Sequence, residues 1–264
     1  MDRTKNAWIN AMFLLVTLGI NAMGAFGLIN GLSQKEISDM YITLITPSPS
    51  TFSIWSVIYS LLILSMILMI IKKDDPYYQK AVDEISLLFR VSSILNMGWI
   101  VAFSFLQLEL SVVFILGFVI ALSLILIKLK RIQSGKRFLL PLTFGLYTGW
   151  LFIATVVNIA ATLVKLKWDG LGIGNEMWAM IILSVSVVLV LVVMLSNRNA
   201  SFPIPVAWAY FGIYQFLKSP AGFNGQYGLL QMVSLGGMAA LIGIAAIQLY
   251  KNQFALIPLK AGRH

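Results

Sequence analysis

Apolar residues occur in long runs that polar or charged segments separate. A helix needs roughly 20 apolar residues to cross the hydrocarbon core of a bilayer. Because most of the runs reach that length, we predict an all-α, polytopic transmembrane helix bundle with about eight spans. The short seventh run is the weakest of these predictions. The runs lie near residues 8–30, 51–71, 85–106, 109–127, 139–164, 177–196, 204–218 and 228–250.

The prolines support these boundaries. Proline is tolerated in a loop or a first helical turn but costs about 3 kcal/mol inside a helix. All 8 prolines lie at a run edge or in a connection, namely Pro47, Pro49, Pro76, Pro141, Pro203, Pro205, Pro220 and Pro258.

Basic residues gather on one side of the predicted bundle. Most of the 19 lysines and arginines fall before the first run, after the last, or in the connections on that same side. The exceptions are Lys35, Lys165, Lys167, Lys218 and Arg90. Cytoplasmic loops carry the excess of basic residues in membrane proteins. We therefore expect both termini in the cytoplasm and the first run to be a retained span, not a cleaved signal peptide.

Composition agrees with a membrane protein. The chain is 59% hydrophobic and 11% charged, whereas soluble domains carry about 25% charged residues. It has no cysteine and a single histidine, His264, which excludes disulfides and predicts no metal site built on cysteine or histidine. The net charge of +9 is explained by membrane orientation, so we expect no nucleic-acid partner.

Aromatic and amide side chains recur at helical spacing on three of the runs. They form stripes on single helix faces: Phe52, Trp55 and Tyr59; Ser92, Asn96, Trp99 and Phe103; and Tyr147, Trp150, Ala154 and Asn158. Polar groups of this kind cannot face lipid tails unpaired. Two interpretations remain open: hydrogen bonds that join helices, or the wall of a pocket for a flat apolar ligand.

Two further features bear on a site. Arg90 lies inside the third run, where it either reaches the headgroups as an anchor or binds an anionic ligand. The connection 30–50 is long enough to act as a lid. Within it, Ser33 and Glu36 have the spacing of a capping box, which predicts a short helix. The runs contain no chain of carboxylates for a proton relay and no central lysine for a retinal, which argues against a pump or a rhodopsin.

The stripes resemble the TspO/MBR family, the tryptophan-rich sensory proteins related to the mitochondrial translocator protein (peripheral benzodiazepine receptor). Trp55 and Tyr59 keep its W-x-x-x-Y, and Asn96 and Trp99 keep its N-x-x-W. The segment 146–158, LYTGWLFIATVVN, keeps Y-x-x-W-x-x-x-A-x-x-x-N. The family's F-G-P-V-W is shortened here to Phe52-Ser53-Ile54-Trp55, without its proline.

The resemblance implies a division of the chain. Residues 1–165 correspond to the family's five-helix core, 166–250 add three helices, as in a longer bacterial branch, and 251–264 form a cytoplasmic tail. The expected location is then a bacterial inner or plasma membrane.

The resemblance also implies a bundle pocket under the first loop that binds protoporphyrin IX, heme, sterols or benzodiazepine-type drugs. The expected ligand-binding residues are Trp55, Tyr59, Asn96, Trp99, Tyr147, Trp150, Ala154 and Asn158. No cofactor is required, although a tetrapyrrole can be bound, and the expected partners are lipid and a small hydrophobic ligand. Whether the protein forms a homodimer is left open.

Three functions compete. The first is a receptor or carrier that binds planar hydrophobic ligands without chemistry, so that the protein is not an enzyme. The second is a small-solute transporter, although the halves show no inverted repeat. The third is a tetrapyrrole-modifying enzyme, although no nucleophile–base pair can be identified.

Overall fold

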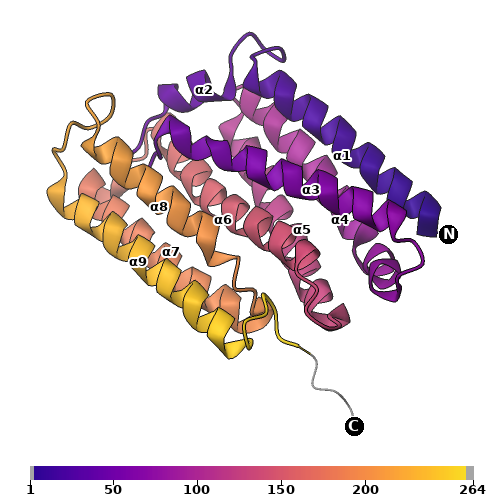
Figure 1. The fold of residues 1–264 in the computed structure, drawn as a ribbon. Helices are drawn as coiled ribbons and strands as arrows, with labels where there is room; N and C mark the ends of the chain where they lie inside the picture. The colour runs from indigo at the N-terminus through magenta and orange to yellow at the C-terminus, as the bar shows by residue number, and fades with distance from the viewer. Residues whose placement is uncertain (1–2, 260–264) are drawn as a thin grey trace.

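The computed structural model describes residues 3–259 as a bundle of long helices (Figure 1). The axes of the long helices are roughly parallel to one another. The elements, in chain order, are α1 (Arg3–Ala25), α2 (Gln34–Met40), η1 (Pro49–Ser53), α3 (Ile54–Ile71), α4 (Pro76–Ser104), α5 (Leu108–Ile132), α6 (Leu139–Lys165), η2 (Gly170–Gly172), α7 (Asn175–Asn197), α8 (Pro203–Lys218) and α9 (Gly228–Lys251).

Successive long helices run in alternating directions, so the bundle has two distinct ends. The start of α1 and the end of α9 lie at one end, which we call the terminal end, and α2 lies at the other, the α2 end (Figure 1). Ion pairs tie neighbouring helices at each end. Arg3 pairs with Asp83 at 2.8 Å at the terminal end, and Lys165 pairs with Glu109 at 2.6 Å at the α2 end.

Seven of the helices in the described part of the chain are long and apolar enough to cross a membrane. The chain is therefore a multi-pass membrane protein, as predicted. The run 204–218 is also helical, but α8 has only 16 residues and extends about 24 Å, less than the hydrocarbon thickness of about 30 Å. One face of α8 packs inside the protein, where Tyr210 and Ile213 are fully buried, whereas Ile204 and Trp208 are exposed. The helix carries the chain from the terminal end to the α2 end (Figure 1).

The helix boundaries differ from the apolar runs mainly where charged residues continue a helix. The third run was predicted from residue 85, yet α4 begins at Pro76, where the Asp75 side chain caps it by accepting a hydrogen bond from the Tyr77 N–H at 2.9 Å. Hydropathy marks only the apolar part of a helix. The prolines all lie where the sequence predicted, in first turns or connections.

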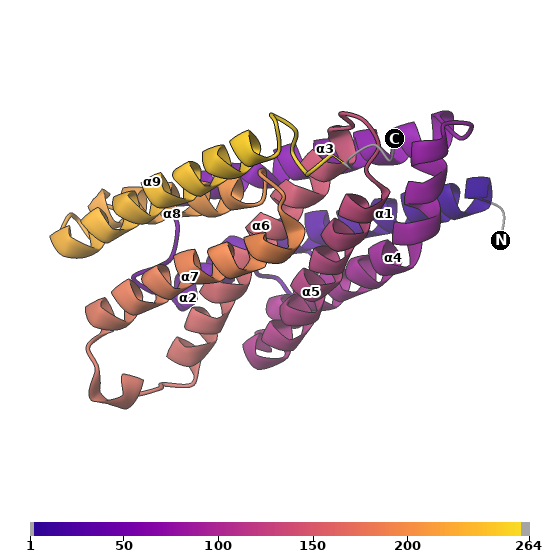
Figure 2. The same cartoon turned by 90° about the horizontal axis from the view of Figure 1, so that it is seen from below.

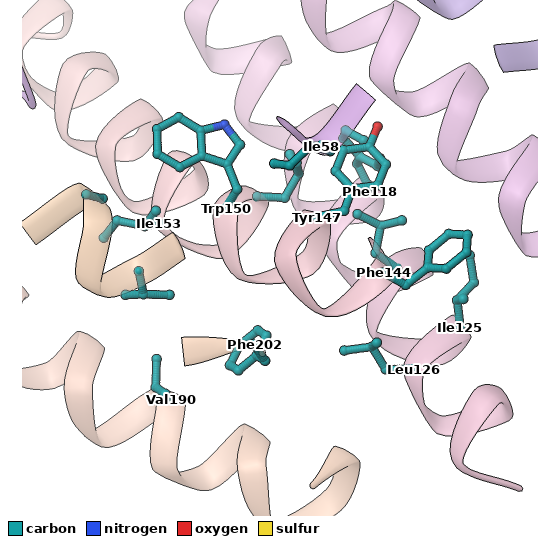
Figure 3. Packing of buried hydrophobic residues seen from close by; sticks show 14 of the residues in the cluster. Ile58, Phe118, Ile125, Leu126, Phe144, Tyr147, Trp150, Ile153, Val190 and Phe202 are labelled. Carbon is teal, nitrogen blue, oxygen red and sulfur yellow. The ribbon is translucent and has the colours of Figure 1, made fainter. Parts of the chain in front are cut away.

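Helix α6 is the centre of the bundle. It is the most buried of the seven spans, and it lies between α1, α3, α4 and α5 on one side and α7, α8 and α9 on the other (Figure 2). Its buried side chains pack on both groups, including Phe118 of α5 and Phe202 before α8 (Figure 3). One hydrophobic core therefore joins the C-terminal helices to the rest.

Two glycines of α6 allow this close contact. A Cβ on Gly149 would lie 2.0 Å from the Phe202 carbonyl oxygen, and one on Gly145 would lie 2.1 Å from the Ser201 hydroxyl. The Asn199 amide donates to the Pro141 carbonyl at 2.8 Å. The glycines thus bring the segment before α8 against the α6 backbone.

Arg90 joins α4 to α1 through hydrogen bonds. Its Nε donates to Asn10 Oδ1 at 2.9 Å, and one Nη donates to Asn6 Oδ1 at 2.7 Å. The Asn10 amide in turn donates to Ser86 Oγ at 2.8 Å. These contacts make Arg90 an interhelical crosslink near the terminal end; a further role as a headgroup anchor or as a ligand contact stays a prediction.

Candidate functional site

A cavity of about 380 Å³ lies at the α2 end of the bundle. Side chains of α3, α4, α6 and α8 form its walls, and residues of α2 and of the segment 46–52 line it as well. Its size falls in the usual range for small-molecule sites, about 300–1,000 Å³.

Aromatic rings meet around this cavity. Trp55 lies at the centre: its ring centroid is 6.3 Å from that of Trp99 and 6.1 Å from that of Trp150. Phe52 packs edge-on against Trp150 at 5.9 Å, and Phe103 lies 6.5 Å from Trp99. The predicted stripes of three helices therefore converge on one space instead of facing lipid.

Two indole N–H groups beside the cavity have no hydrogen-bond partner. They are Nε1 of Trp99 and Nε1 of Trp150, both buried. Burying an unpaired donor costs about 1–3 kcal/mol, and such groups are few in folded proteins. An acceptor reaches them only when neighbouring side chains move, because the nitrogens themselves have almost no accessible surface.

Three of the predicted site residues lie beneath the cavity and do not line it. Asn96 is fully buried and donates to the Tyr147 hydroxyl at 2.9 Å, and it accepts a bond of 2.9 Å from the Asn21 amide of α1. Tyr59 stacks on Trp55 at 5.0 Å. Tyr147 points to the same side of α6 as Trp150 (Figure 3). These residues form a polar floor that positions the rings above it.

The other predicted residues line the cavity itself: Trp55, Trp99, Trp150, Ala154 and Asn158. The Asn158 amide donates to Ser111 Oγ of α5 at 2.9 Å, so it also holds two helices together. Both interpretations of the stripes, hydrogen bonds that join helices and the wall of a pocket, therefore apply, but to different residue types. The amides join helices, and the tryptophans surround the cavity.

Helix α2 covers one side of the cavity, as expected of the connection 30–50. The predicted capping box is present: Ser33 and Glu36 exchange hydrogen bonds at the start of α2. Bonds from the Ser33 N–H and hydroxyl lower the pKa of Glu36. Gln34, Lys35 and Asp39 of α2 line the cavity, and Lys35 pairs with Asp39.

The segment 48–51, which we call the strap, is hydrogen-bonded to α8 and lines the cavity through Pro49. The Ser48 N–H donates to the Gly212 carbonyl at 2.9 Å, and the Trp208 indole donates to the Thr51 carbonyl at 2.9 Å. The Ser48 hydroxyl donates to Gln215 Oε1 at 3.1 Å. A Cβ on Gly212 would lie 1.9 Å from the Thr51 hydroxyl, so this contact requires glycine.

Sequence reasoning missed the contribution of α8. Ala209 and Phe216 of α8 line the cavity, although they lie outside the residues that resemble the five-helix core. The available signal was the pair Gly145 and Gly149, whose four-residue spacing is typical of close helix packing. Among the described residues, no cluster of histidine, cysteine or acidic side chains could hold a metal ion.

Comparison with known proteins bears on the whole of this arrangement. A family model described as TSPO-like protein matches residues 7–249. The chain belongs to the TSPO-like protein family. No curated protein and no solved structure matches it significantly. The family match confirms the resemblance that the stripes predicted, and it continues through most of α9. The three C-terminal helices thus lie within the family pattern of a TSPO-like protein.

Proposed function

We propose that the protein is a membrane receptor or carrier that binds planar hydrophobic ligands, with tetrapyrroles such as protoporphyrin IX or heme as the first candidates and sterol-like lipids as the next. The ligand occupies the cavity between α3, α4, α6 and α8. The observation that carries the proposal is the convergence of three tryptophans on this cavity, two of them with unpaired N–H groups.

The chemistry of the walls suits such a ligand. Aromatic faces at right angles, as between Trp55 and Trp150, offer both stacking and edge contacts to a flat ring system. The unpaired indole donors suit acceptors on the ligand. Lys35 also lines the cavity, and a ligand carboxylate would compete for it with its present partner Asp39.

Titration with protoporphyrin IX tests the proposal. The absorbance of the porphyrin is the readout, because replacing a tryptophan changes the protein fluorescence. Trp150→Phe keeps a ring but removes the donor, so we expect affinity to fall roughly tenfold, about 1.4 kcal/mol. Trp150→Ala and Asn158→Ala should weaken binding as well.

Trp8→Phe is the matched control, because Trp8 is 60% exposed on α1 at the terminal end. If Trp150→Ala and Asn158→Ala both bind protoporphyrin IX with wild-type affinity, the ligand does not bind in this cavity.

The proposal treats binding as the function, without conversion of the ligand. Protoporphyrin IX incubated with the protein in darkness should therefore keep its mass. A new product in the mass spectrum, formed by the wild type and not by Trp150→Ala, would replace this proposal with an enzymatic one.

For the location we propose a bacterial inner or plasma membrane with the terminal end in the cytoplasm. The basic residues support this orientation, because Lys128, Arg137 and Arg198 lie at the terminal end and cytoplasmic segments carry the basic excess.

A further inference from the structure

A second cavity, of about 230 Å³, lies between α6 and α7 at the α2 end of the bundle. We call it the side cavity. The loops 42–45 and 223–227 complete its walls. No residue lines both this space and the cavity of the proposed ligand. The two cavities are close along α6, because Ala160 lines the side cavity and Ala161 lines the ligand cavity. The side cavity is therefore a separate space, formed where the C-terminal helices meet the rest of the bundle.

Most of the side chains that line the side cavity are apolar, such as Leu44, Leu163 and Ile182, and none is charged. The polar side chains lie toward the loops and the start of α7, and they include Thr43, Asn175 and Tyr227. The Thr43 hydroxyl lies 3.2 Å from that of Thr46. The side cavity therefore offers an apolar part between the helices and polar groups at its loop side, which suits an amphiphile.

Aromatic rings form the rim of the side cavity. Trp168 and Trp178 lie 5.2 Å apart, and Phe223 and Tyr227 lie 5.5 Å apart. The Trp178 indole donates to the Gly170 carbonyl at 2.7 Å, which fixes its ring. These rings lie at helix ends, where tryptophan and tyrosine of membrane proteins meet the headgroup region.

The two walls of the side cavity belong to helices that cross the membrane. Figure 2 shows α6 and α7 joined at this end by the long loop that contains η2. An apolar space between two spans, with its aromatic rim at the headgroup level, lies beside the hydrocarbon chains of the bilayer.

We propose that the side cavity binds one acyl chain of a membrane phospholipid, with the headgroup at the aromatic rim. The chain would fill the space between Leu163 of α6 and Ala179 of α7. This inference does not depend on the proposed tetrapyrrole ligand, because it concerns different residues.

Native mass spectrometry of the protein released from nanodiscs of phosphatidylethanolamine and phosphatidylglycerol tests it. Ala179→Phe places a ring in the cavity, and Leu163→Trp fills it from the opposite wall, so that one failure to fold does not end the test. Ala240→Phe is the control, because Ala240 is exposed on α9. We expect the wild type and Ala240→Phe to retain one phospholipid, and each filled variant to bind it roughly tenfold more weakly.

Equal lipid retention in all four proteins, with circular dichroism showing that they are folded, would overturn the proposal. So would a filled variant that keeps its lipid but loses protoporphyrin IX, because the cavity would then belong to that ligand. Loss of lipid with unchanged porphyrin affinity supports the acyl-chain site and leaves the proposed function as it was.

Discussion

Asn96 is the residue on which the floor of the ligand cavity depends. It bridges Asn21 of α1 and Tyr147 of α6 from its place on α4. Asn96→Leu keeps the volume but leaves the Tyr147 hydroxyl without this donor, at a cost of about 1–2 kcal/mol. Thermal unfolding in detergent should show the loss. Ile94→Leu, at a side chain 53% exposed, serves as the control, and an equal shift in both variants would contradict this role.

For single residues, the sequence predicted which side chains face the inside of the bundle but not the hydrogen-bond partner of each. Helical spacing placed Asn96, Trp99 and Tyr147 on inward faces, because polar groups avoid lipid. Asn21, the partner of Asn96, shares one buried face of α1 with Asn10 and Thr17, but nothing in that spacing identifies Asn96 as the residue it bonds. Which pairs meet depends on the rotation and depth of each helix, and spacing along one helix does not determine these.

Among the elements, α8 controls the strap, and Gly212 is where the two touch. Ala favours a helix over Gly by about 1 kcal/mol, yet Gly212→Ala would push its methyl group into Thr51. We expect the strap to leave α8 and protoporphyrin IX affinity to fall roughly tenfold. Gly236→Ala is the control, because a Cβ there meets nothing within 4 Å.

Thr51→Gly added to Gly212→Ala removes the colliding side chain and should restore most of the affinity. If Gly212→Ala binds as well as Gly236→Ala, the strap does not form part of the site.

The sequence predicted these elements better than their arrangement. Long apolar runs define spans because lipid requires them, and the capping box at Ser33 correctly placed α2. The run 204–218 forms a helix of only 16 residues that still carries the chain from the terminal end to the α2 end, and its short length gave no sign that it forms a wall of the cavity. The wall formed by α8 depends on long-range packing through Gly145 and Gly149. The sequence of α6 shows these two glycines but does not show which segment packs against them.

For the whole molecule, the strongest remaining prediction concerns orientation. The chain passes along the bundle so that the start of α1 and the end of α9 lie at the same end (Figure 1), and basic residues concentrate there. The chain contains no cysteine, so a single introduced thiol can be labelled without background. Ser134, at the terminal end, and Gln226, at the α2 end, are both exposed.

A membrane-impermeant maleimide applied to intact cells should label Gln226→Cys and leave Ser134→Cys unlabelled until the membrane is opened. The physical reason is that lysine and arginine are retained on the cytoplasmic side during insertion. The reverse pattern would place the termini outside, and the ligand cavity would then open toward the cytoplasm. Labelling of both sites from outside would contradict this fold, because α6, α7 and α8 each carry the chain between the two ends on the way from Ser134 to Gln226.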